Sequence, residues 1–424
     1  MKIAGIVRVP GDKSITHRAL MLAALARGTS YLGGALTSLD AGSTARVLRR
    51  LGVGVSPLRA QQTVEVRGRS RFQSPAHPLD CGNSGTTARL LLGLLAGHRF
   101  AATLTGDSSL RRRPMRRVTG PLGEMGARVT ESNGDGLPLT IRGGPLRPIR
   151  YRMPVSSAQV KSALLFAGVT GKVPVEVYEP GGRSRDHTER MLQGAGFSVS
   201  SDDGWIRFAP DSRLAPFEMQ VPGDISSAAF LIATALLAEA GELTLASVGI
   251  NPTRTGLLAV LERMGAHVIV VPTLEEQGEP VGDLMIRPAH LRGTEVFARE
   301  IPGLIDEIPV LAALATRATG TTVFRQAGEL RVKESDRLEL MAANIRALGG
   351  RADVHGEDLW VEGNPEPPRG RVVTAGDHRL AMAFQVLGTL PGSRVRVDDP
   401  RSADVSFPGF ARVLRSVQAR RSRG

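Results

Sequence analysis

Residues 10–20, PGDKSITHRAL, place a lysine, two hydroxyls, a histidine and an arginine immediately before an apolar run. A proline and a glycine interrupt the chain there, and Asp12 or Ser14 is a typical residue to cap a helix. The pattern therefore predicts Lys13, Ser14 and Arg18 at or near a helix N-terminus, whose unpaired backbone N–H groups attract anions. Two cations added to such an end indicate an anionic ligand.

Six further stretches place polar or charged residues at the head of an apolar helix. They are GNSGTTAR (82–89), SLRRRPM (109–115), SSAQVKSALL (156–165), LIDEIP (304–309), RVKESDRL (331–338) and DHR (377–379). If these segments converge on one cleft, its cations need a substrate with several negative charges, such as phosphates and carboxylates. Asp306 and Glu334 are then candidates for proton transfer, with Lys13 and Lys333 as partners.

Each stretch by itself has a simpler interpretation. The arginines of 111–117 are typical of a solvated basic loop, and His17 is typical of a packing or capping histidine. Asp306 and His187 fit helix N-caps. The GDKS tetrapeptide lacks the glycine spacing of a P-loop, so it does not predict nucleoside triphosphate binding. These interpretations do not explain why cations and hydroxyls recur at so many predicted helix starts.

Lysine is rare in this chain, which makes its positions informative. Five of the 54 lysine and arginine residues are lysines, and Lys13, Lys161 and Lys333 lie in the polar stretches. We infer that Lys13 and Lys333 do something that arginine cannot, such as acting as a compact charge or moving a proton. Lys333 and Arg337 are four residues apart and are expected to share one face of a helix.

The composition limits the class of protein. The length of 424 residues predicts two or three domains, and the hydrophobic content of 42% is ample for their cores. The formal net charge is +13. Cys81 is the single cysteine, so neither an intrachain disulfide nor a cysteine-rich metal site is expected. The N-terminus is charged, unlike a signal peptide, and the longest apolar run, 228–238, is too short to span a membrane. We expect a cytoplasmic location and no membrane partner.

One short sequence pattern recurs along the chain and indicates internal repeats. Five amphipathic segments end in a glycine that precedes a predicted strand, at Gly52, Gly126, Gly196, Gly265 and Gly349. Their spacing of roughly 70 residues exceeds that of the usual solenoid repeats and favours a compact α/β subdomain. A final helix near 410–418 would complete a sixth unit.

Taken in order, PGDKSITHR and the six further stretches closely resemble the motifs of the 5-enolpyruvylshikimate-3-phosphate (EPSP) synthase family of enolpyruvyl transferases. The resemblance covers about residues 8 to 410. It implies an α/β fold, an inside-out α/β prism of two globular domains with six βαβαββ repeats, three per domain. One domain would comprise 1–12 plus 222–424 and the other 13–221, with the active site in the cleft between them.

The resemblance also implies a reaction and its residues. The enolpyruvyl group of phosphoenolpyruvate would pass to a ring hydroxyl of shikimate-3-phosphate, in the shikimate pathway, with phosphate lost from a tetrahedral intermediate. No metal or organic cofactor is implied. The implied shikimate-3-phosphate site is Lys13, Ser14, Arg18, Ser157, Ala158, Gln159, Arg185, Asp306 and Lys333. The implied phosphoenolpyruvate site is Lys13, Gly85, Arg113, Gln159, Glu334, Arg337 and Arg379.

Within these sites the family pattern assigns individual roles. Arg18 would meet the carboxylate side of shikimate-3-phosphate and Arg185 its phosphate. The catalytic residues would be Asp306, Glu334 and Lys13. Asp306 would take the proton of the attacking hydroxyl, and Glu334 with Lys13 would manage the proton at the methylene carbon.

The chain departs from the enterobacterial members of the family at two positions. Val405 and Glu329 stand where those members carry a lysine and an asparagine, so neither contact is carried over. Gly85 is the position at which a bulkier residue accompanies glyphosate tolerance in the family, and its presence here predicts inhibition by glyphosate.

Three alternatives remain open. The sister enolpyruvyl transferase acting on UDP-N-acetylglucosamine typically uses a cysteine in the loop that is GDSSL (106–110) here, which has none. A nucleic-acid-binding protein should show aromatic platforms or a concentrated basic face, but aromatic residues make up 4% of the chain. A non-catalytic binder is disfavoured because every expected acid, base and cation is present. The expected partners are the two small-molecule substrates, with no nucleic acid, and the chain is expected to be a monomer.

Overall fold

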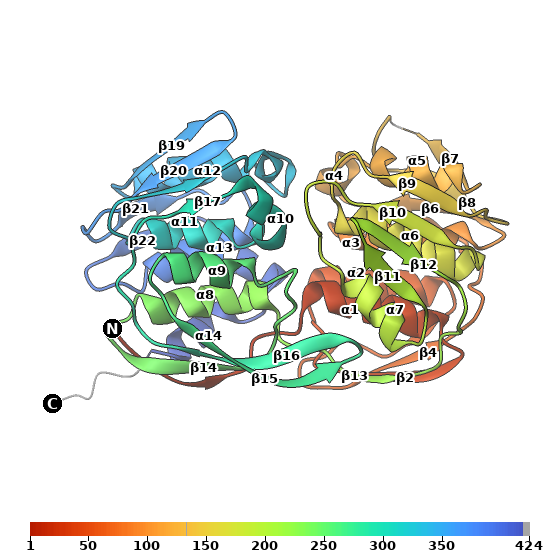
Figure 1. Cartoon of the computed structure of the whole chain (residues 1–424), viewed down its shortest axis with the longest axis horizontal. Helices are drawn as coiled ribbons and strands as arrows, with labels where there is room; N and C mark the ends of the chain where they lie inside the picture. The colour runs from red at the N-terminus through yellow and green to blue at the C-terminus, as the bar shows by residue number, and fades with distance from the viewer. Residues whose placement is uncertain (133, 419–424) are drawn as a thin grey trace. The chain divides into compact units, whose positions relative to one another are not determined.

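The computed structural model describes residues 1–132 and 134–418, which form two compact units (Figure 1). Unit 1 comprises Met1–Pro10, Pro222–Leu274 and the residues from Pro280 onward, and unit 2 comprises Gly11–Val221 and Glu275–Glu279. The chain therefore enters unit 2 after Pro10 and leaves it after Val221. No helix among the described residues is long and apolar enough to cross a membrane.

Unit 2 contains three four-stranded sheets, in the orders β13-β2-β4-β3, β5-β6-β8-β7 and β11-β12-β10-β9. The strands are β2 (Gly28–Gly33), β3 (Gly54–Val55), β4 (Val64–Gly68), β5 (Leu79–Asp80), β6 (Ala101–Thr105), β7 (Arg128–Glu131), β8 (Leu139–Arg142), β9 (Ile149–Arg152), β10 (Val175–Tyr178), β11 (Val199–Asp202), β12 (Trp205–Phe208) and β13 (Glu218–Gln220). The helices are α1 (Lys13–Leu25), α2 (Leu39–Arg50), α3 (Gly85–Ala96), α4 (Ser108–Arg111), α5 (Arg116–Glu124), α6 (Ala158–Gly171) and α7 (His187–Gly194).

Unit 1 contains two four-stranded sheets, β1-β14-β16-β15 and β17-β18-β20-β19, and the two-stranded sheet β21-β22. The strands are β1 (Lys2–Val7), β14 (Ala240–Gly249), β15 (Val268–Glu276), β16 (Glu279–Ile286), β17 (Glu295–Val296), β18 (Thr321–Phe324), β19 (Arg351–His355), β20 (Asp358–Glu362), β21 (Arg369–Val372) and β22 (Arg394–Val397). The helices are α8 (Ile225–Leu236), α9 (Gly256–Arg263), α10 (Ile301–Leu304), α11 (Ile308–Ala315), α12 (Arg337–Ala347), α13 (His378–Leu387) and α14 (Phe410–Ser416), with the 3₁₀ helices η1 (Ala298–Glu300), η2 (Gly328–Val332) and η3 (Pro400–Val405).

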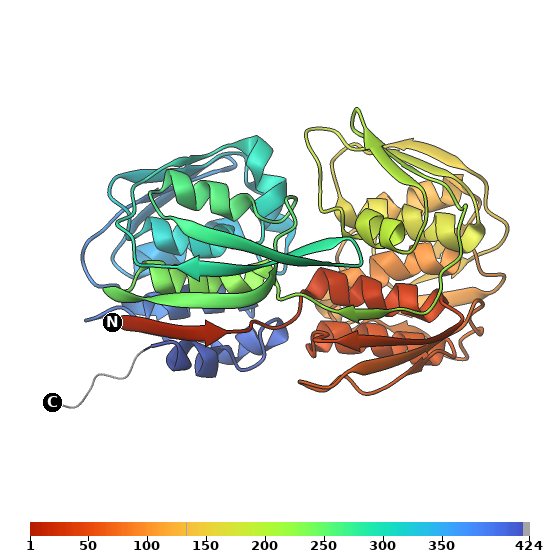
Figure 2. The same cartoon turned by 60° about the horizontal axis from the view of Figure 1, so that its bottom comes forward.

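The six sheets agree with the predicted repeats. In the four-stranded sheets one parallel pair is extended by antiparallel strands, as in the run β5-β6-β8-β7. Two sheets take their first strand from a distant part of the chain: β13 pairs with β2, and β1 lies along β14 (Figure 2). The five repeated glycines have φ between 84° and 112°, the left-handed backbone predicted for residues that end a helix.

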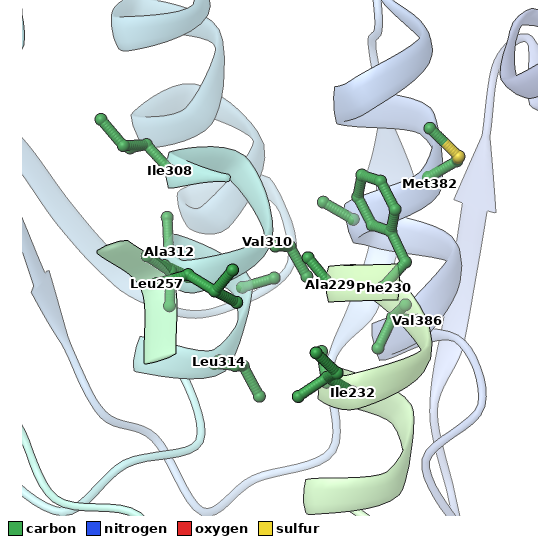
Figure 3. Packing of buried hydrophobic residues seen from close by; sticks show 14 of the residues in the cluster. Ala229, Phe230, Ile232, Leu257, Ile308, Val310, Ala312, Leu314, Met382 and Val386 are labelled. Atoms are coloured by element: carbon green, nitrogen blue, oxygen red, sulfur yellow. The ribbon is translucent and has the colours of Figure 1, made fainter. Parts of the chain in front are cut away.

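The central helices of both units are buried on all sides. Every residue of α8 is buried, and Phe230 and Ile232 pack among side chains of α11 and α13, including Val310 and Val386 (Figure 3). In unit 2, α3 and α6 lie so close that a Cβ on Gly93 would meet the Ala163 carbonyl oxygen at 1.9 Å. Because these helices are apolar along their length, their polar residues are concentrated at the N-terminal ends.

Candidate active site

Three helices of unit 2 begin with predicted site residues, and each start is fixed by a side-chain cap. Asp12 accepts a hydrogen bond from the backbone N–H of Ile15 at 2.8 Å and caps α1. Ser84 and Ser157 cap α3 and α6 in the same way. Lys13, Gly85 and Ala158 are therefore first residues of helices, where backbone N–H groups favour anions.

Arg18 is buried inside unit 2 and held at three of its nitrogens. Nε donates to Thr188 Oγ1 at 2.7 Å, Nη1 to the Ser14 carbonyl at 2.9 Å and Nη2 to Ser162 Oγ at 2.7 Å. Burial lowers the pKa of Arg18 to about 10, and the nearby carboxylate of Glu189 acts against this shift. Arg185 also lowers the Arg18 pKa, which places a second cation in its vicinity.

The starts of α3 and α6 are joined around Gln159. Its side-chain oxygen accepts from Arg89 Nη1 at 2.6 Å, and its amide nitrogen donates to Thr86 Oγ1 at 3.1 Å. Arg113 donates to Asn83 Oδ1 at 2.6 Å, and a Cβ on Gly85 would lie 3.3 Å from Arg113 Nη1. The structure thus brings Gly85, Arg113 and Gln159 to one region of unit 2.

The solvated-loop interpretation of the arginine-rich segment is wrong in part, because Arg111 ends α4 and Arg116 and Arg117 begin α5. Arg113 is half-buried, whereas the other four arginines of 111–117 are exposed. Lys13 is also half-buried, and its Nζ lies 3.3 Å from Asp40 Oδ2 on α2. Asp40 is a partner of Lys13 that the sequence analysis did not identify.

A buried hydrogen-bond chain connects α1 to the start of α3. His17 Nδ1 lies 2.7 Å from Thr44 Oγ1, Thr44 Oγ1 lies 2.7 Å from Thr87 Oγ1, and Thr87 donates to Ser84 Oγ at 2.8 Å. Because the Thr87 hydroxyl proton goes to Ser84, that of Thr44 goes to Thr87, and His17 must donate from Nδ1. Its Nε2 is buried without a hydrogen-bond partner in the described part of the chain. Burial lowers the pKa of His17 to about 4, so the ring is neutral at pH 7.

In unit 1, Arg337 is the centre of an ionic cluster. Its side chain is 1% exposed, Nε donates to Asp377 Oδ2 at 2.7 Å, and Nη2 donates to Glu334 Oε2 at 2.6 Å. Nη1 lies 3.6 Å from Asp306 Oδ1. Burial alone would lower the pKa of Arg337, but Asp377, Glu334 and Asp306 raise it well above its ordinary value.

Asp306 lies between two guanidinium groups. Arg379 Nη2 is 3.5 Å from Asp306 Oδ2, and Arg337 approaches the other carboxylate oxygen. Asp306 is not a helix cap. It lies in the turn before α11, and Glu307 occupies the N-cap position of that helix. The simpler capping interpretation of Asp306 is therefore wrong. The carboxylate of Asp306 is thus held by two of the guanidinium groups predicted to bind phosphoenolpyruvate.

Lys333 is a predicted site residue of unit 1, but it pairs outside the ionic cluster around Arg337. Its Nζ lies 3.1 Å from Glu329 Oε1, one of the two positions at which the chain departs from enterobacterial members. The prediction that Lys333 and Arg337 share a helical face is wrong. Asp336 caps α12 by accepting from the Glu339 N–H at 3.1 Å, so the helix begins only at Arg337.

The capping prediction for His187 is also wrong. His187 is the first residue of α7, and Asp186 occupies the capping position. The His187 ring is buried, with Nδ1 2.7 Å from Glu279 Oε1.

Sequence analysis missed several residues that hold the predicted ones in place. Asp377 is the clearest case, because it caps α13 and binds Arg337 at the same time. The dipeptide Gly-Asp before an apolar helix precedes α1, α8 and α13 alike, and it could have indicated Asp377 and Asp224 as caps. Arg89 ends the GNSGTTAR stretch but had no predicted role, and Glu279 had no comparable local signal.

Cys81 lies in the hydrophobic core of unit 2. The thiol is buried, and burial raises its pKa to about 12, which does not suit a general acid at neutral pH. Among the described residues no group of three or more His, Cys, Asp or Glu side chains is arranged to hold a metal ion.

Comparisons with known proteins agree over the length of the chain. Residues 1–414 match the family model described as EPSP synthase (3-phosphoshikimate 1-carboxyvinyltransferase). A 3-phosphoshikimate 1-carboxyvinyltransferase of Halorhodospira halophila is 49% identical over 415 residues, which cover 97% of this chain and 93% of that protein. One from Desulfitobacterium hafniense is 46% identical over 417 residues, 98% of this chain and 96% of that protein.

Solved structures show the same similarity. An EPSP synthase from Acinetobacter baumannii has a TM-score of 0.88 at 36% identity, covering 98% of this chain and 96% of that one. The enolpyruvyl transferase NikO from Streptomyces tendae shares the fold, with a TM-score of 0.79 at 19% identity over 98% of this chain and 95% of that one. These matches confirm the predicted two-domain enolpyruvyl transferase fold, and the chain belongs to the EPSP synthase family.

Proposed function

We propose that the residues described above transfer the enolpyruvyl group of phosphoenolpyruvate to a ring hydroxyl of shikimate-3-phosphate and release phosphate. Family membership makes the chain a 3-phosphoshikimate 1-carboxyvinyltransferase of the shikimate pathway, which supplies aromatic amino acids. Both substrates are multiply charged anions, which suits the guanidinium groups and helix starts of the predicted sites.

Unit 2 supplies the proposed anion contacts of shikimate-3-phosphate. Three of the five N–H groups of Arg18 are used by Thr188, Ser14 and Ser162 in the described part of the chain. The remaining two lie on different terminal nitrogens, a fork that matches a carboxylate. Ser157, at the start of α6, and Arg185 are proposed to hold the phosphate.

Phosphoenolpyruvate is proposed to bind the remaining predicted cations. Arg113 beside Gly85 supplies a guanidinium in unit 2, and Arg337 and Arg379 supply two in unit 1. The Nη1 of Arg337 is buried without a hydrogen-bond partner among the described residues, so it retains donors for an anion. Gln159 is proposed to contact both substrates, and Lys333 is proposed to contact shikimate-3-phosphate.

The proposed chemistry is addition followed by elimination. The attacking hydroxyl gives its proton to Asp306 as its oxygen bonds to C2 of phosphoenolpyruvate, and Glu334 with Lys13 delivers a proton to the methylene carbon. The resulting methyl group then returns a proton to Glu334 with Lys13 as the bond between C2 and the phosphate oxygen breaks, and the departing phosphate takes up the proton held by Asp306. The products are inorganic phosphate and the enol ether.

The observation that best supports this assignment is the half-buried Asp306 carboxylate between the Arg337 and Arg379 guanidiniums, because it places the proposed base beside two cations proposed to bind phosphoenolpyruvate. The Asp306→Asn substitution removes the base and should lower kcat by about 100-fold or more. The matched control is Asp336→Asn, since asparagine caps a helix as well as aspartate and Asp336 is proposed only as a cap. Equal losses in the two variants would contradict the role of Asp306.

Phosphate release tests the reaction itself. Purified protein is mixed with phosphoenolpyruvate and either shikimate-3-phosphate or UDP-N-acetylglucosamine. Release with shikimate-3-phosphate alone supports the proposal, and release with the nucleotide sugar alone assigns the sister reaction despite the buried Cys81. Release with neither acceptor refutes both. The monomeric state and the cytoplasmic location stay predictions from the sequence.

A further inference from the structure

The end of the β15–β16 hairpin is a part of unit 2 that no motif indicated. Residues Glu275–Glu279 belong to this unit, whereas the rest of the hairpin belongs to unit 1. The two-residue turn has φ of 50° at Gln277 and 80° at Gly278, as in a tight hairpin turn. Across residues 271–280 one side chain is buried, and it is the carboxylate of Glu279. A charged group at that position needs a specific partner.

His187 is that partner. Its Nδ1 lies 2.7 Å from Glu279 Oε1, and both side chains are 1% exposed. A buried carboxylate without a donor is strongly unfavourable, and the Nδ1–H of His187 is placed to supply one. The two residues are 92 positions apart, and the pair fixes the first residue of α7 to the hairpin turn.

The hairpin turn also packs along the rest of α7. The Gly278 carbonyl accepts from Arg190 Nη1 at 3.3 Å, and a Cβ on Gly194 would meet the Gln277 carbonyl carbon at 2.9 Å. Contacts at the beginning, middle and end of this eight-residue helix leave it little freedom to shift within unit 2.

From α7 the contacts continue to the proposed anion site. Thr188, directly after His187, accepts from Arg18 Nε at 2.7 Å and donates to Ser162 at 2.7 Å. Arg185 lies two residues before His187, and Glu279 is close enough to Arg18 to act on its charge. The Glu279–His187 pair is therefore linked to the segment that carries Arg185 and Thr188, and Thr188 in turn holds Arg18.

We propose that Glu279 is a positioning residue for the shikimate-3-phosphate site, acting through His187 on the segment that carries Arg185 and Thr188. This inference rests on the proposed function and adds to it a residue from the hairpin. Glu279 touches no substrate in this scheme. It fixes the places from which Arg18 and Arg185 meet their ligand, and such placement governs affinity.

The test compares substitutions at two neighbouring carboxylates of the same turn. Glu279→Met keeps the volume but removes the acceptor, and Glu279→Gln keeps an acceptor oxygen without the charge. The matched control is Glu276→Met, because Glu276 Oε2 accepts from the Gln220 N–H at 3.2 Å and, in the described part of the chain, makes no hydrogen bond to the 184–190 segment. KM for each substrate, kcat and calorimetric binding of shikimate-3-phosphate are measured for all variants.

Positioning predicts a selective effect. Glu279→Met should raise KM and Kd for shikimate-3-phosphate by about tenfold, with KM for phosphoenolpyruvate within about twofold of wild type. Glu279→Gln should restore most of the affinity, and Glu276→Met should resemble wild type. If Glu279 acted only through its charge beside Arg18, both Glu279 variants would bind the anion more tightly than wild type, which would overturn the proposal.

Two further outcomes keep the inference separate from the proposed function. An inactive wild-type protein refutes the function, whereas an active wild type with unchanged or equally raised KM values in Glu279→Met refutes the positioning role. If Glu279→Met does not fold, the double substitution Glu279→Met with His187→Phe replaces both polar partners by apolar groups of similar shape. This double variant should fold and still bind shikimate-3-phosphate about tenfold more weakly, and wild-type affinity in it would contradict the proposal.

Discussion

Acidification should destabilise unit 2 through His17. The folded pKa is about 4 and the ordinary value is 6.5, because burial disfavours the charged ring. Protonation would also place an N–H on Nε2, which has no partner in the described part of the chain. Between these two pKa values the unfolded chain binds a proton that the folded chain does not, so the free energy of unfolding falls as the pH falls. This contribution is fully present above pH 6.5.

The magnitude follows from the size of the shift. Relative to pH 7, His17 should cost unit 2 about 2 kcal/mol at pH 5 and about 3 kcal/mol at pH 4. The comparison protein is His17→Asn, whose side-chain amide can donate to Thr44 as Nδ1 does but does not titrate. Other titrating groups are common to both proteins, so their contributions cancel in the difference.

The two tryptophans allow unit 2 to be followed separately. Trp205 is in β12 of unit 2 and Trp360 is in β20 of unit 1, so a Trp360→Phe background leaves Trp205 as the reporter. Urea unfolding of this protein, with and without His17→Asn, is measured at pH 7, 5 and 4. The protein that keeps His17 should lose about 3 kcal/mol more than the variant between pH 7 and pH 4. Parallel pH dependence of the two proteins would refute the reasoning.

Three further predictions concern ligand binding and the buried charges. Gly85→Ala adds a Cβ 3.3 Å from Arg113 Nη1. KM for phosphoenolpyruvate should therefore rise severalfold, with little change in KM for shikimate-3-phosphate. Equal changes in the two KM values would contradict this prediction. With Gly85 in place, glyphosate should inhibit, and a steady-state inhibition constant of millimolar or weaker would count against the proposed site. Lys161→Met removes the ammonium that lies 2.7 Å from both Glu179 and Glu189. Burial already raises the pKa of the Glu189 carboxyl. The free energy of unfolding of unit 2, followed by Trp205, should fall by about 3–5 kcal/mol, and a loss under about 1 kcal/mol would indicate that the carboxyl groups become neutral.

Much of the local structure could be predicted from the sequence. Asp12 was one of two predicted caps for α1, and the repeated glycines, such as Gly52, adopt the left-handed backbone expected after a helix. These features depend on hydrogen bonds between residues three or four positions apart, which a sequence pattern displays directly. The same dependence explains the error at Lys333, because Asp336 is also a good cap, so α12 begins at Arg337 and Lys333 lies outside the helix.

The candidate site residues were identified from the ordered sequence motifs. Their partners could be identified only from the packing of the folded chain. Arg337 binds Asp377 across 40 residues, and Glu279 reaches His187 across 92. A buried charge is stabilised by whichever opposite charge the folded chain brings to it, and nothing in the local sequence specifies that choice. The sequence by itself determined that polar and charged residues stand at the starts of helices such as α1, α3 and α6. Only the tertiary structure decided which charges are paired, because that depends on contacts between residues far apart in the chain.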